Sequence, residues 1–207
     1  MSGGPSLNTD ALVLRPWPPT DTFQSFTVFT PDRGALRIHQ RLPGKKPSAT
    51  YLPLGLFDEV SFVLEGAPSG DAWFVKEARL LTRHAGIGRR YESLLQASAF
   101  AQLAARNPGS EESYPAIHAL LRTAFTAFAA SDRPDIVYLK SLYCFARDEG
   151  YAVKQQWFPA LPPTDRPLAI ALINQPLASQ TTPPADVTRL LRSLEHYLRA
   201  HTEIHLD

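Results

Sequence analysis

The chain has 207 residues, of which 44% are hydrophobic and 20% are charged, and its formal net charge at pH 7 is +1. This balance is typical of a soluble globular protein, and the single cysteine, Cys144, excludes an internal disulfide framework and a cysteine-based zinc site. No apolar run approaches the roughly 18 residues that a membrane span needs, and the first ten residues lack a secretory signal pattern, so we expect a cytoplasmic protein.

The first part of the chain predicts strands. Residues 1–10 are small and polar and are predicted to form a flexible tail. The five expected strands lie at about 11–14, 23–30, 35–41, 52–64 and 72–81. The second and third are joined by Pro31-Asp32-Arg33-Gly34, where proline and glycine suit the dihedral angles of a β-turn.

Beyond residue 82 apolar residues recur with helical spacing. The expected helices cover 89–106, 113–130, about 132–150, and a last stretch that begins near Pro184. The stripe assigned to the first helix includes Leu94 and Leu95, Gly150 caps the third helix, and the short apolar run 168–174 could be a strand.

The order of these elements predicts an α+β fold, because strands precede helices without βαβ alternation. We expect two domains, residues 1–81 and 82–207. Five short strands within about 70 residues suit a small closed barrel of the OB-fold type, and the remainder is expected to be all-helical.

Positive charge is concentrated in the predicted hairpin and the loop after it. Asp32 to Lys46 has a local net charge of +4, although the whole chain nets +1. The cations are Arg33, Arg37, Arg41, Lys45 and Lys46. Strand alternation places Leu36 and Ile38 on one face and Arg37, His39 and Arg41 on the other. We expect these cations to contact nucleic-acid phosphates; the alternative is a solvated sheet face on which charge prevents aggregation.

Several aromatic residues near this hairpin could stack on bases. They are Trp17, Phe23, Phe26, Phe29 and Tyr51. Most of them are expected to fill the core of the small barrel. Trp17, in a proline-rich loop, is the best candidate for stacking at the surface, although packing is an alternative for it too.

Signatures of common enzyme classes are absent from the sequence, including GxGxxG, GxxxxGK[ST], HExxH and GxSxG. Residues 85–88 contain two glycines before a helix, which indicates a domain hinge. His196, His201 and His205 have no carboxylate that completes a convincing metal site, and Cys144 is expected to pack as a small apolar residue. We therefore expect a protein that is not an enzyme and needs no cofactor or metal.

Several segments resemble the bacterial recombination mediator family RecO. Those in the first part are ALVLRPW (11–17), VFTPDRGALRIHQR (28–41) and GKKPS (44–48). Those in the helical part are RRYESLLQASAFAQLAAR (89–106), DIVYLKSLYCFARDEGYAV (135–153) and LLRSLEHYLRAHTEIHLD (190–207). The likeness extends over most of the chain from about residue 11, and segments 28–48 and 135–153 are the most specific.

The resemblance implies a DNA repair and recombination function in the RecF pathway. Members of the family have an OB-fold followed by a helical domain, bind single- and double-stranded DNA, and anneal complementary strands. They partner with RecR, contact the C-terminal tail of single-stranded-DNA-binding protein and assist loading of the RecA recombinase, as nucleoid-associated cytoplasmic proteins. By this resemblance Arg33, Arg37, Arg41, Lys45 and Lys46 face DNA.

Two departures from the family matter. Many relatives carry a four-cysteine zinc module, and the single cysteine here means that no metal is expected. The part from residue 82 onward carries thirteen Lys or Arg against twelve acids, which is less basic than a strong DNA-binding domain. Two alternatives stay open: a protein–protein adaptor with little or no DNA binding, and a hydrolase or transferase whose site is assembled from scattered residues.

Overall fold

The chain divides into two compact units. A computed structural model describes residues 4–44, 51–67 and 72–206. One unit comprises Met1–His84 and Pro108–Arg122, and the other comprises Ala85–Asn107 and Thr123–Asp207. We call them the ring unit and the helical unit. The predicted boundary at residues 81 and 82 stays a prediction, while residues 108–122 group with the strands in this division.

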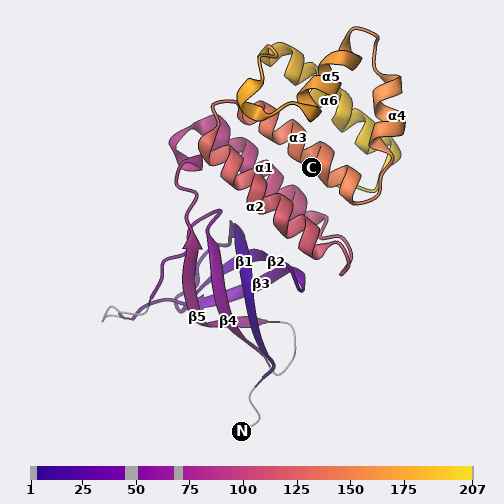
Figure 1. Ribbon diagram of the computed structural model, residues 1–207. Coiled ribbons are helices and arrows are strands. Elements are labelled where there is room, and N and C mark those ends of the chain that lie inside the picture. Colours follow the sequence, from indigo (N-terminus) through magenta and orange to yellow (C-terminus); the bar gives the residue numbers. More distant parts are fainter. Residues whose placement is uncertain (1–3, 45–50, 68–71, 207) are drawn as a thin grey trace. The chain divides into compact units, whose positions relative to one another are not determined.

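Five strands form a mostly antiparallel sheet that closes in a ring (Figure 1). They are β1 (Ser6–Pro16), β2 (Phe23–Thr30), β3 (Gly34–Arg41), β4 (Glu59–Gly66) and β5 (Trp73–Thr82). Their order is β1-β2-β3-β5-β4, and β4 pairs back onto β1. Among the described residues, β3 and β5 form the one parallel pairing, which covers Ile38↔Trp73 and His39↔Phe74. An N-terminal five-stranded sheet followed by helices is therefore confirmed.

Two predicted strand boundaries are wrong. Residues 6–10, expected in the tail, belong to β1 and pair with β4; their polar composition conceals a strand whose Thr9 is buried. Residues 52–58, expected to begin the fourth strand, are irregular, because Phe57 has a φ of 65° and the Asp58 carboxylate accepts a hydrogen bond from the Gly55 N–H at 2.8 Å. This segment is apolar because it packs against the ring's core, not because it is extended.

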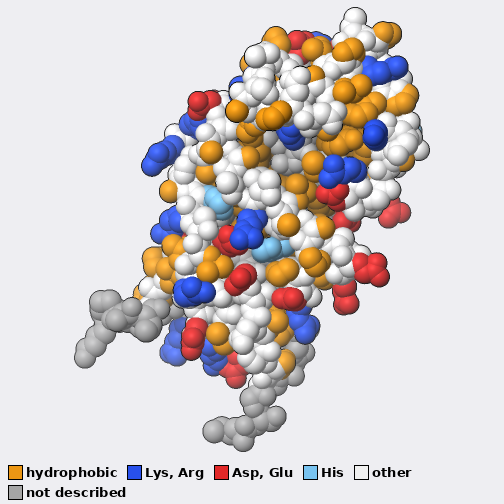
Figure 2. Space-filling view, viewed as in Figure 1, with side chains coloured by type: hydrophobic (Ala, Val, Ile, Leu, Met, Phe, Trp, Pro, Cys, Tyr) orange, Lys and Arg blue, Asp and Glu red, His pale blue; other side chains and the backbone are white. Residues whose placement is uncertain are grey.

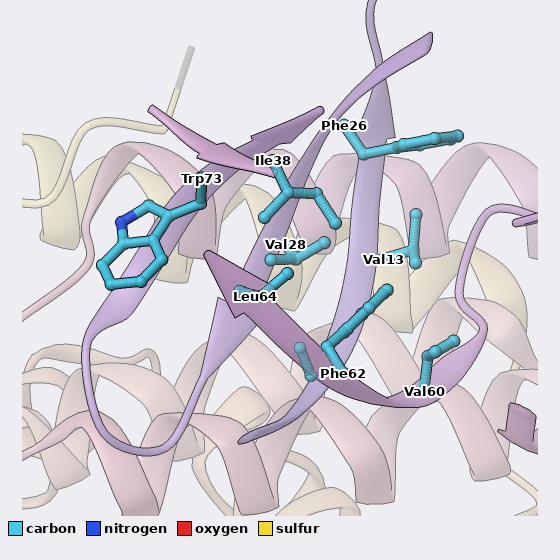
Figure 3. Packing of buried hydrophobic residues seen from close by; sticks show 9 residues of the cluster. Val13, Phe26, Val28, Ile38, Val60, Phe62, Leu64 and Trp73 are labelled. Carbon is cyan, nitrogen blue, oxygen red and sulfur yellow. The ribbon is translucent and has the colours of Figure 1, made fainter. Parts of the chain in front are cut away.

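Alternating side chains fill the interior of the ring (Figure 3). The buried cluster comes from all five strands and consists of Ala11, Val13, Phe26, Val28, Ile38, Val60, Phe62, Leu64 and Trp73. Leu36 packs against this cluster beside Ile38, as alternation predicts. The inward position of Leu36 and Ile38 directs the intervening Arg37 to the outer face, where it is exposed.

One end of the outer face of β2 and β3 is covered within the ring unit. The Tyr114 ring meets the Phe29 ring edge-on at 6.3 Å. Gly34 has a φ of 62°, and a Cβ there would lie 2.7 Å from the Tyr114 ring, so both the turn and the packing require glycine. Arg122, from the same stretch 108–122, forms an ion pair with buried Glu59 at 3.1 Å. Among the described residues of the ring unit, the part of this face away from the β2–β3 turn carries exposed Arg37 and Arg41.

The helices are α1 (Tyr91–Arg106), α2 (Tyr114–Ala130), α3 (Pro134–Asp148), α4 (Val153–Ala160), α5 (Asp165–Asn174) and α6 (Pro184–His201). Four of them confirm the predicted helices. The possible strand at 168–174 is wrong, since these residues lie in α5, and an apolar run this short does not distinguish strand from helix. Within the helical unit α3 packs against α1, α4, α5 and α6 (Figure 1). No helix among the described residues is both long enough and apolar enough to cross a membrane.

The inward face of α1 differs from its predicted stripe. Leu94 and Leu95 are 36% and 54% exposed, and Tyr91 is 72% exposed. The buried face is formed by Ala97, Phe100, Ala101, Leu103 and Ala104. Most residues of the buried face are alanines, whose small side chains contribute little to a periodicity pattern. The pattern was therefore dominated by Leu94 and Leu95, and it assigned the buried stripe to the wrong face of α1.

Candidate nucleic-acid interface

Two arginines flank a tryptophan on the open outer face of the ring. Arg15 of β1, Thr27 of β2 and Arg37 of β3 lie in one cross-strand row. Trp17, in the loop after β1, donates a hydrogen bond from Nε1 to Thr27 Oγ1 at 3.0 Å. The guanidinium carbons of Arg15 and Arg37 lie 4.4 Å and 4.6 Å from the centre of the Trp17 ring. Stacking of this kind uses the flat face of a guanidinium and leaves its N–H donors for other partners.

A cluster of rings continues the same face along β2, β3 and β5. The His39 ring lies 5.5 Å from Phe74 and 6.5 Å from Phe23, and Phe23 lies 5.6 Å from Phe74. All three are half-buried. The Ser25 hydroxyl hydrogen-bonds His39 Nδ1 at 2.8 Å. Burial, and secondly the charge of Arg37, lower the pKa of His39, so its imidazole is neutral at pH 7.

We call this surface the aromatic–arginine strip; it consists of Arg15, Trp17, Phe23, Arg37, His39, Arg41 and Phe74. Arg37 and Arg41 share the outer face of β3, and Arg41 lies opposite Phe23 in the strand register. The strip can therefore offer guanidinium donors to an anionic chain and half-buried rings to flat groups carried by that chain.

The predicted site residues fall into three groups. Arg37 and Arg41 belong to the strip. Arg33 is exposed in the β2–β3 turn, with its guanidinium carbon 5.7 Å from the centre of the Trp73 ring, so it lies away from the Trp17 row. Lys45 and Lys46 lie outside the described residues. No ion pair found in the described part of the chain involves Arg33, Arg37 or Arg41, and their contact with DNA stays a prediction.

Arg15 was missed by sequence reasoning because of a bulge. Simple alternation from Ala11 and Val13, both buried, would turn Arg15 into the core. The register of β1 against β2 shifts between Val13 and Arg15, which places Arg15 opposite Thr27 on the outer face. A β-bulge of this kind re-aims a side chain without a sequence signal that alternation can detect.

The five aromatic residues considered for base stacking also lie in different places. Phe26 is in the ring's core, and Phe29 is buried beneath Tyr114. Trp17 and Phe23 lie in the strip, half-buried. Tyr51 lines a pocket at the end of β3. The expectation of core positions is confirmed for Phe26 and Phe29, and a stacking role for half-buried Trp17 stays a prediction.

A second charged cluster of the ring unit serves packing. The Arg83 guanidinium donates two hydrogen bonds, of 3.0 Å and 2.7 Å, to the carboxylate of buried Asp58. Burial lowers the pKa of His118 despite the opposing charge of nearby Glu59. In the described ranges no group of three or more His, Cys, Asp or Glu could hold a metal ion. This cluster fastens residues 108–122 and the segment before β4 to the sheet.

Charge elsewhere on the surface is mixed. Figure 2 shows Lys and Arg side chains interspersed with Asp and Glu over the visible face, without a broad patch of one sign. The chain as a whole is nearly neutral. Recognition of an anion would therefore depend on locally available guanidinium groups and not on a general positive field.

Neither the known protein family models nor the curated protein sequences contain a match to this chain.

Proposed function

We propose that the protein is a DNA repair and recombination mediator that binds single-stranded DNA along the aromatic–arginine strip. The observation that carries this proposal is the row in which Trp17 holds the guanidinium groups of Arg15 and Arg37 on an exposed face. A binding surface for nucleic acid needs cations for phosphates and rings for bases, and this face combines both within four neighbouring strands.

The ring itself supports the proposal as an OB-fold. Its five strands close in the order β1-β2-β3-β5-β4, which is compatible with that fold. OB-folds bind oligonucleotides on the face of strands 2 and 3 and at the loop between strands 1 and 2. The strip occupies the corresponding positions, with Trp17 in the loop after β1 and Arg37 on β3.

The proposed mechanism is electrostatic and tolerant of sequence. Arg15, Arg37 and Arg41 take phosphates and release the counterions that surround them. Phe23, His39 and Phe74 offer rings on which bases stack, and every base has a face that can do so. A strand whose phosphates are neutralised in this way can approach its complement, which is what annealing requires.

The wider mediator role rests on the likeness to the RecO family. It includes binding of double-stranded DNA, cooperation with a RecR-type protein, contact with the tail of single-stranded-DNA-binding protein, and help in loading a recombinase. Arg33, Lys45 and Lys46 are proposed to extend the DNA path beyond the strip.

A titration of labelled oligonucleotides tests the DNA-binding proposal. Single- and double-stranded probes are titrated at about 50 mM and about 200 mM salt, with fluorescence anisotropy as the signal. Three phosphate contacts on a single strand predict a slope of log affinity against log salt near −2, by the rule of about −0.7 for each contact. Absence of binding at the lower salt concentration would remove the function.

An adaptor function is the second candidate, and one observation favours it. Tyr91, Leu94 and Leu95 lie at helical neighbour positions on α1 and are all exposed. Clustered apolar side chains are typical of surfaces that bind other proteins. No measurable DNA binding, together with binding of a partner protein that is lost in Leu95→Asp, would favour the adaptor.

A further inference from the structure

Residues 108–122 lie against one end of the outer face of β2 and β3. The Tyr114 ring rests edge-on against Phe29, which has no exposed surface, and touches Gly34. The helical part of this stretch is the first half of α2, and a helix of that length does not persist in water by itself. Packing against the sheet therefore keeps the stretch ordered.

An ion pair and a histidine lie where this stretch is fastened to β4. Arg122 pairs with the carboxylate of Glu59, the first residue of β4, at 3.1 Å. His118 precedes Arg122 by one helical turn, is only 8% exposed, and is within reach of the charge of Glu59. The imidazole is therefore enclosed beside the ion pair.

One ring nitrogen of His118 has no partner. Its Nε2 is buried and forms no hydrogen bond with any of the described residues. A neutral imidazole carries a single N–H and can leave this nitrogen bare, whereas the protonated ring carries an N–H at both positions. Protonation in the packed state would therefore bury a donor without an acceptor, which is costly. Water can accept that N–H once the stretch has left the sheet.

Charged groups from three other elements act on His118, and they oppose one another. Glu59, Asp10 of β1 and Asp32 of the β2–β3 turn favour the protonated ring. Burial and the charge of Arg122, on the same helix, disfavour it. Burial is the largest of these effects, so the pKa of His118 lies below its usual value.

A second histidine lies within reach of the same carboxylate. His84 follows β5, is 8% exposed, and is acted on by the charges of Glu59 and Asp58. Burial lowers the pKa of His84 as well. Asp58 is paired with Arg83. Because His84 lies outside residues 108–122, substitutions can separate the contributions of the two histidines.

We propose that residues 108–122 form a latch on the sheet that opens when His118 takes up a proton. The closed latch holds the neutral ring, and the open latch lets water solvate the charged one. The closed state is favoured above about pH 6.5, where an exposed histidine is neutral, and loses stability as the pH falls below that value. Opening uncovers Phe29, one position beyond the row of Thr27 on the outer face. This inference does not depend on the proposed function.

The size of the effect follows from the linkage between opening and proton uptake. A histidine that is exposed in the open latch and stays neutral in the closed one makes opening about tenfold more favourable at pH 5.5 than at pH 7.5. This is the largest change that one such group can cause over this range. The proton therefore shifts the population of the open state by a limited and measurable factor.

Hydrogen exchange of the intact protein tests the latch. Exchange rates of the amides of residues 117–122 are measured at pH 7.5 and pH 5.5, and each is divided by the intrinsic rate of an exposed amide at that pH. Opening exposes these amides because the detached half-helix does not persist in water. We expect the corrected rates to rise by up to about tenfold at pH 5.5. At both pH values they should exceed the corrected rates of amides in β1 and β4, which marks a local opening.

Two variants identify the group that takes up the proton. His118→Gln and His118→Leu cannot be protonated in this range, so their corrected rates at the two pH values should agree within about twofold. The control His196→Gln removes an exposed histidine of α6 and should leave the rise unchanged. Circular dichroism identifies a variant that fails to fold, and the other His118 variant then decides.

Four results would overturn the latch. Equal corrected rates at the two pH values would show that opening is not linked to a proton. Slower exchange at pH 5.5 would show that Glu59 accepts the new N–H and tightens the contact. A rise that persists in the folded His118 variants would assign the proton to another group, which His84→Gln tests. Exchange at the rate of the β1 and β4 amides would show that the stretch opens only when the ring unit unfolds.

Discussion

The arginines of the strip differ from several cations of the helical unit and from Arg83 of the ring unit, which pairs with Asp58. In the helical unit Arg133 is bound by Asp135, Arg189 by Asp165 and Asp186, and Lys140 by three backbone carbonyls. In the ring unit Arg15 and Arg37 lie over the Trp17 ring. An ion pair consumes the N–H donors of a guanidinium, whereas stacking on a ring preserves them.

This difference teaches that the count of charges is a poor guide to binding. From residue 82 onward the chain carries thirteen basic residues, but several of them stabilise helix ends and helix–helix contacts. The strip contains three arginines, and no ion pair in the described part of the chain occupies Arg15, Arg37 or Arg41. We therefore expect DNA affinity to depend on guanidinium N–H donors that no group of the protein occupies, and substitutions in each unit test this expectation.

The largest effect is expected from Arg15→Ala combined with Arg37→Ala. Loss of two phosphate contacts should weaken binding of single-stranded DNA about 50-fold at low salt and reduce the magnitude of the salt slope by about 1.4. Anisotropy titrations at several salt concentrations measure both quantities.

The matched control removes the same charge from the helical unit. Arg147→Ala with Lys154→Ala also lowers the net charge by two, and Arg147 is paired with Asp148. This double variant should change the affinity for single-stranded DNA by less than about threefold. Equal losses in the two double variants would show that overall charge, and not the strip, drives binding.

A smaller effect, on stability instead of binding, is expected from Lys140→Met. Lys140 Nζ donates to the carbonyls of Leu172, Ile173 and Gln175 at 3.1, 2.9 and 2.8 Å, which satisfies the C-terminal end of α5. Burial lowers the pKa of this lysine. The substitution should cost about 2 kcal/mol in the free energy of unfolding, measured with denaturant.

Lys154→Met serves as the control for that variant, because Lys154 is exposed on α4. It should change stability by less than about 0.5 kcal/mol. DNA affinity should be unchanged in both variants. A loss of DNA affinity in Lys140→Met protein that is still folded would contradict the assignment of DNA binding to the strip in the ring unit.

The smallest effect is a pH dependence of DNA affinity. Burial, and secondly the charge of Arg37, lower the pKa of His39 in the free protein, so the imidazole is neutral at pH 7 and gains its proton under more acidic conditions. A phosphate bound beside it favours the protonated form. Affinity should therefore rise about threefold as pH falls from 7.5 to about 5.5, in titrations at constant salt.

His39→Asn, which cannot be protonated in this range, should remove that rise while the affinity at pH 7.5 stays within about twofold. The comparison requires a folded protein at the lower pH, which circular dichroism checks. A rise of equal size in His39→Asn would assign the pH dependence to another group.

Much of the ring could be predicted from the sequence, because its strands obey simple rules. Alternation at Leu36, Arg37 and Ile38 gave the orientation of β3 correctly, and Pro31 with Gly34 marked the turn. The β1 bulge, which exposes Arg15, and the left-handed Phe57 in the segment before β4 could not be foreseen. In both places the backbone departs locally from regular strand geometry because of tertiary packing, and the residue types at these positions do not indicate it.

The candidate site was only partly predictable for a related reason. Arg37 and Arg41 could be placed on one face from sequence spacing alone. Their relation to Trp17 and Phe74 depends on pairing between strands distant in the sequence, which local sequence patterns do not reveal.

Gly34 has a consequence for how this protein can vary among relatives. Its positive φ shapes the hairpin turn, and its missing side chain makes room for the Tyr114 ring. Insertions at this turn would lift the ring from Phe29 and loosen residues 108–122. We expect orthologous chains to change in length at the loop around 17–22, and to keep glycine at the position that the Tyr114 ring contacts.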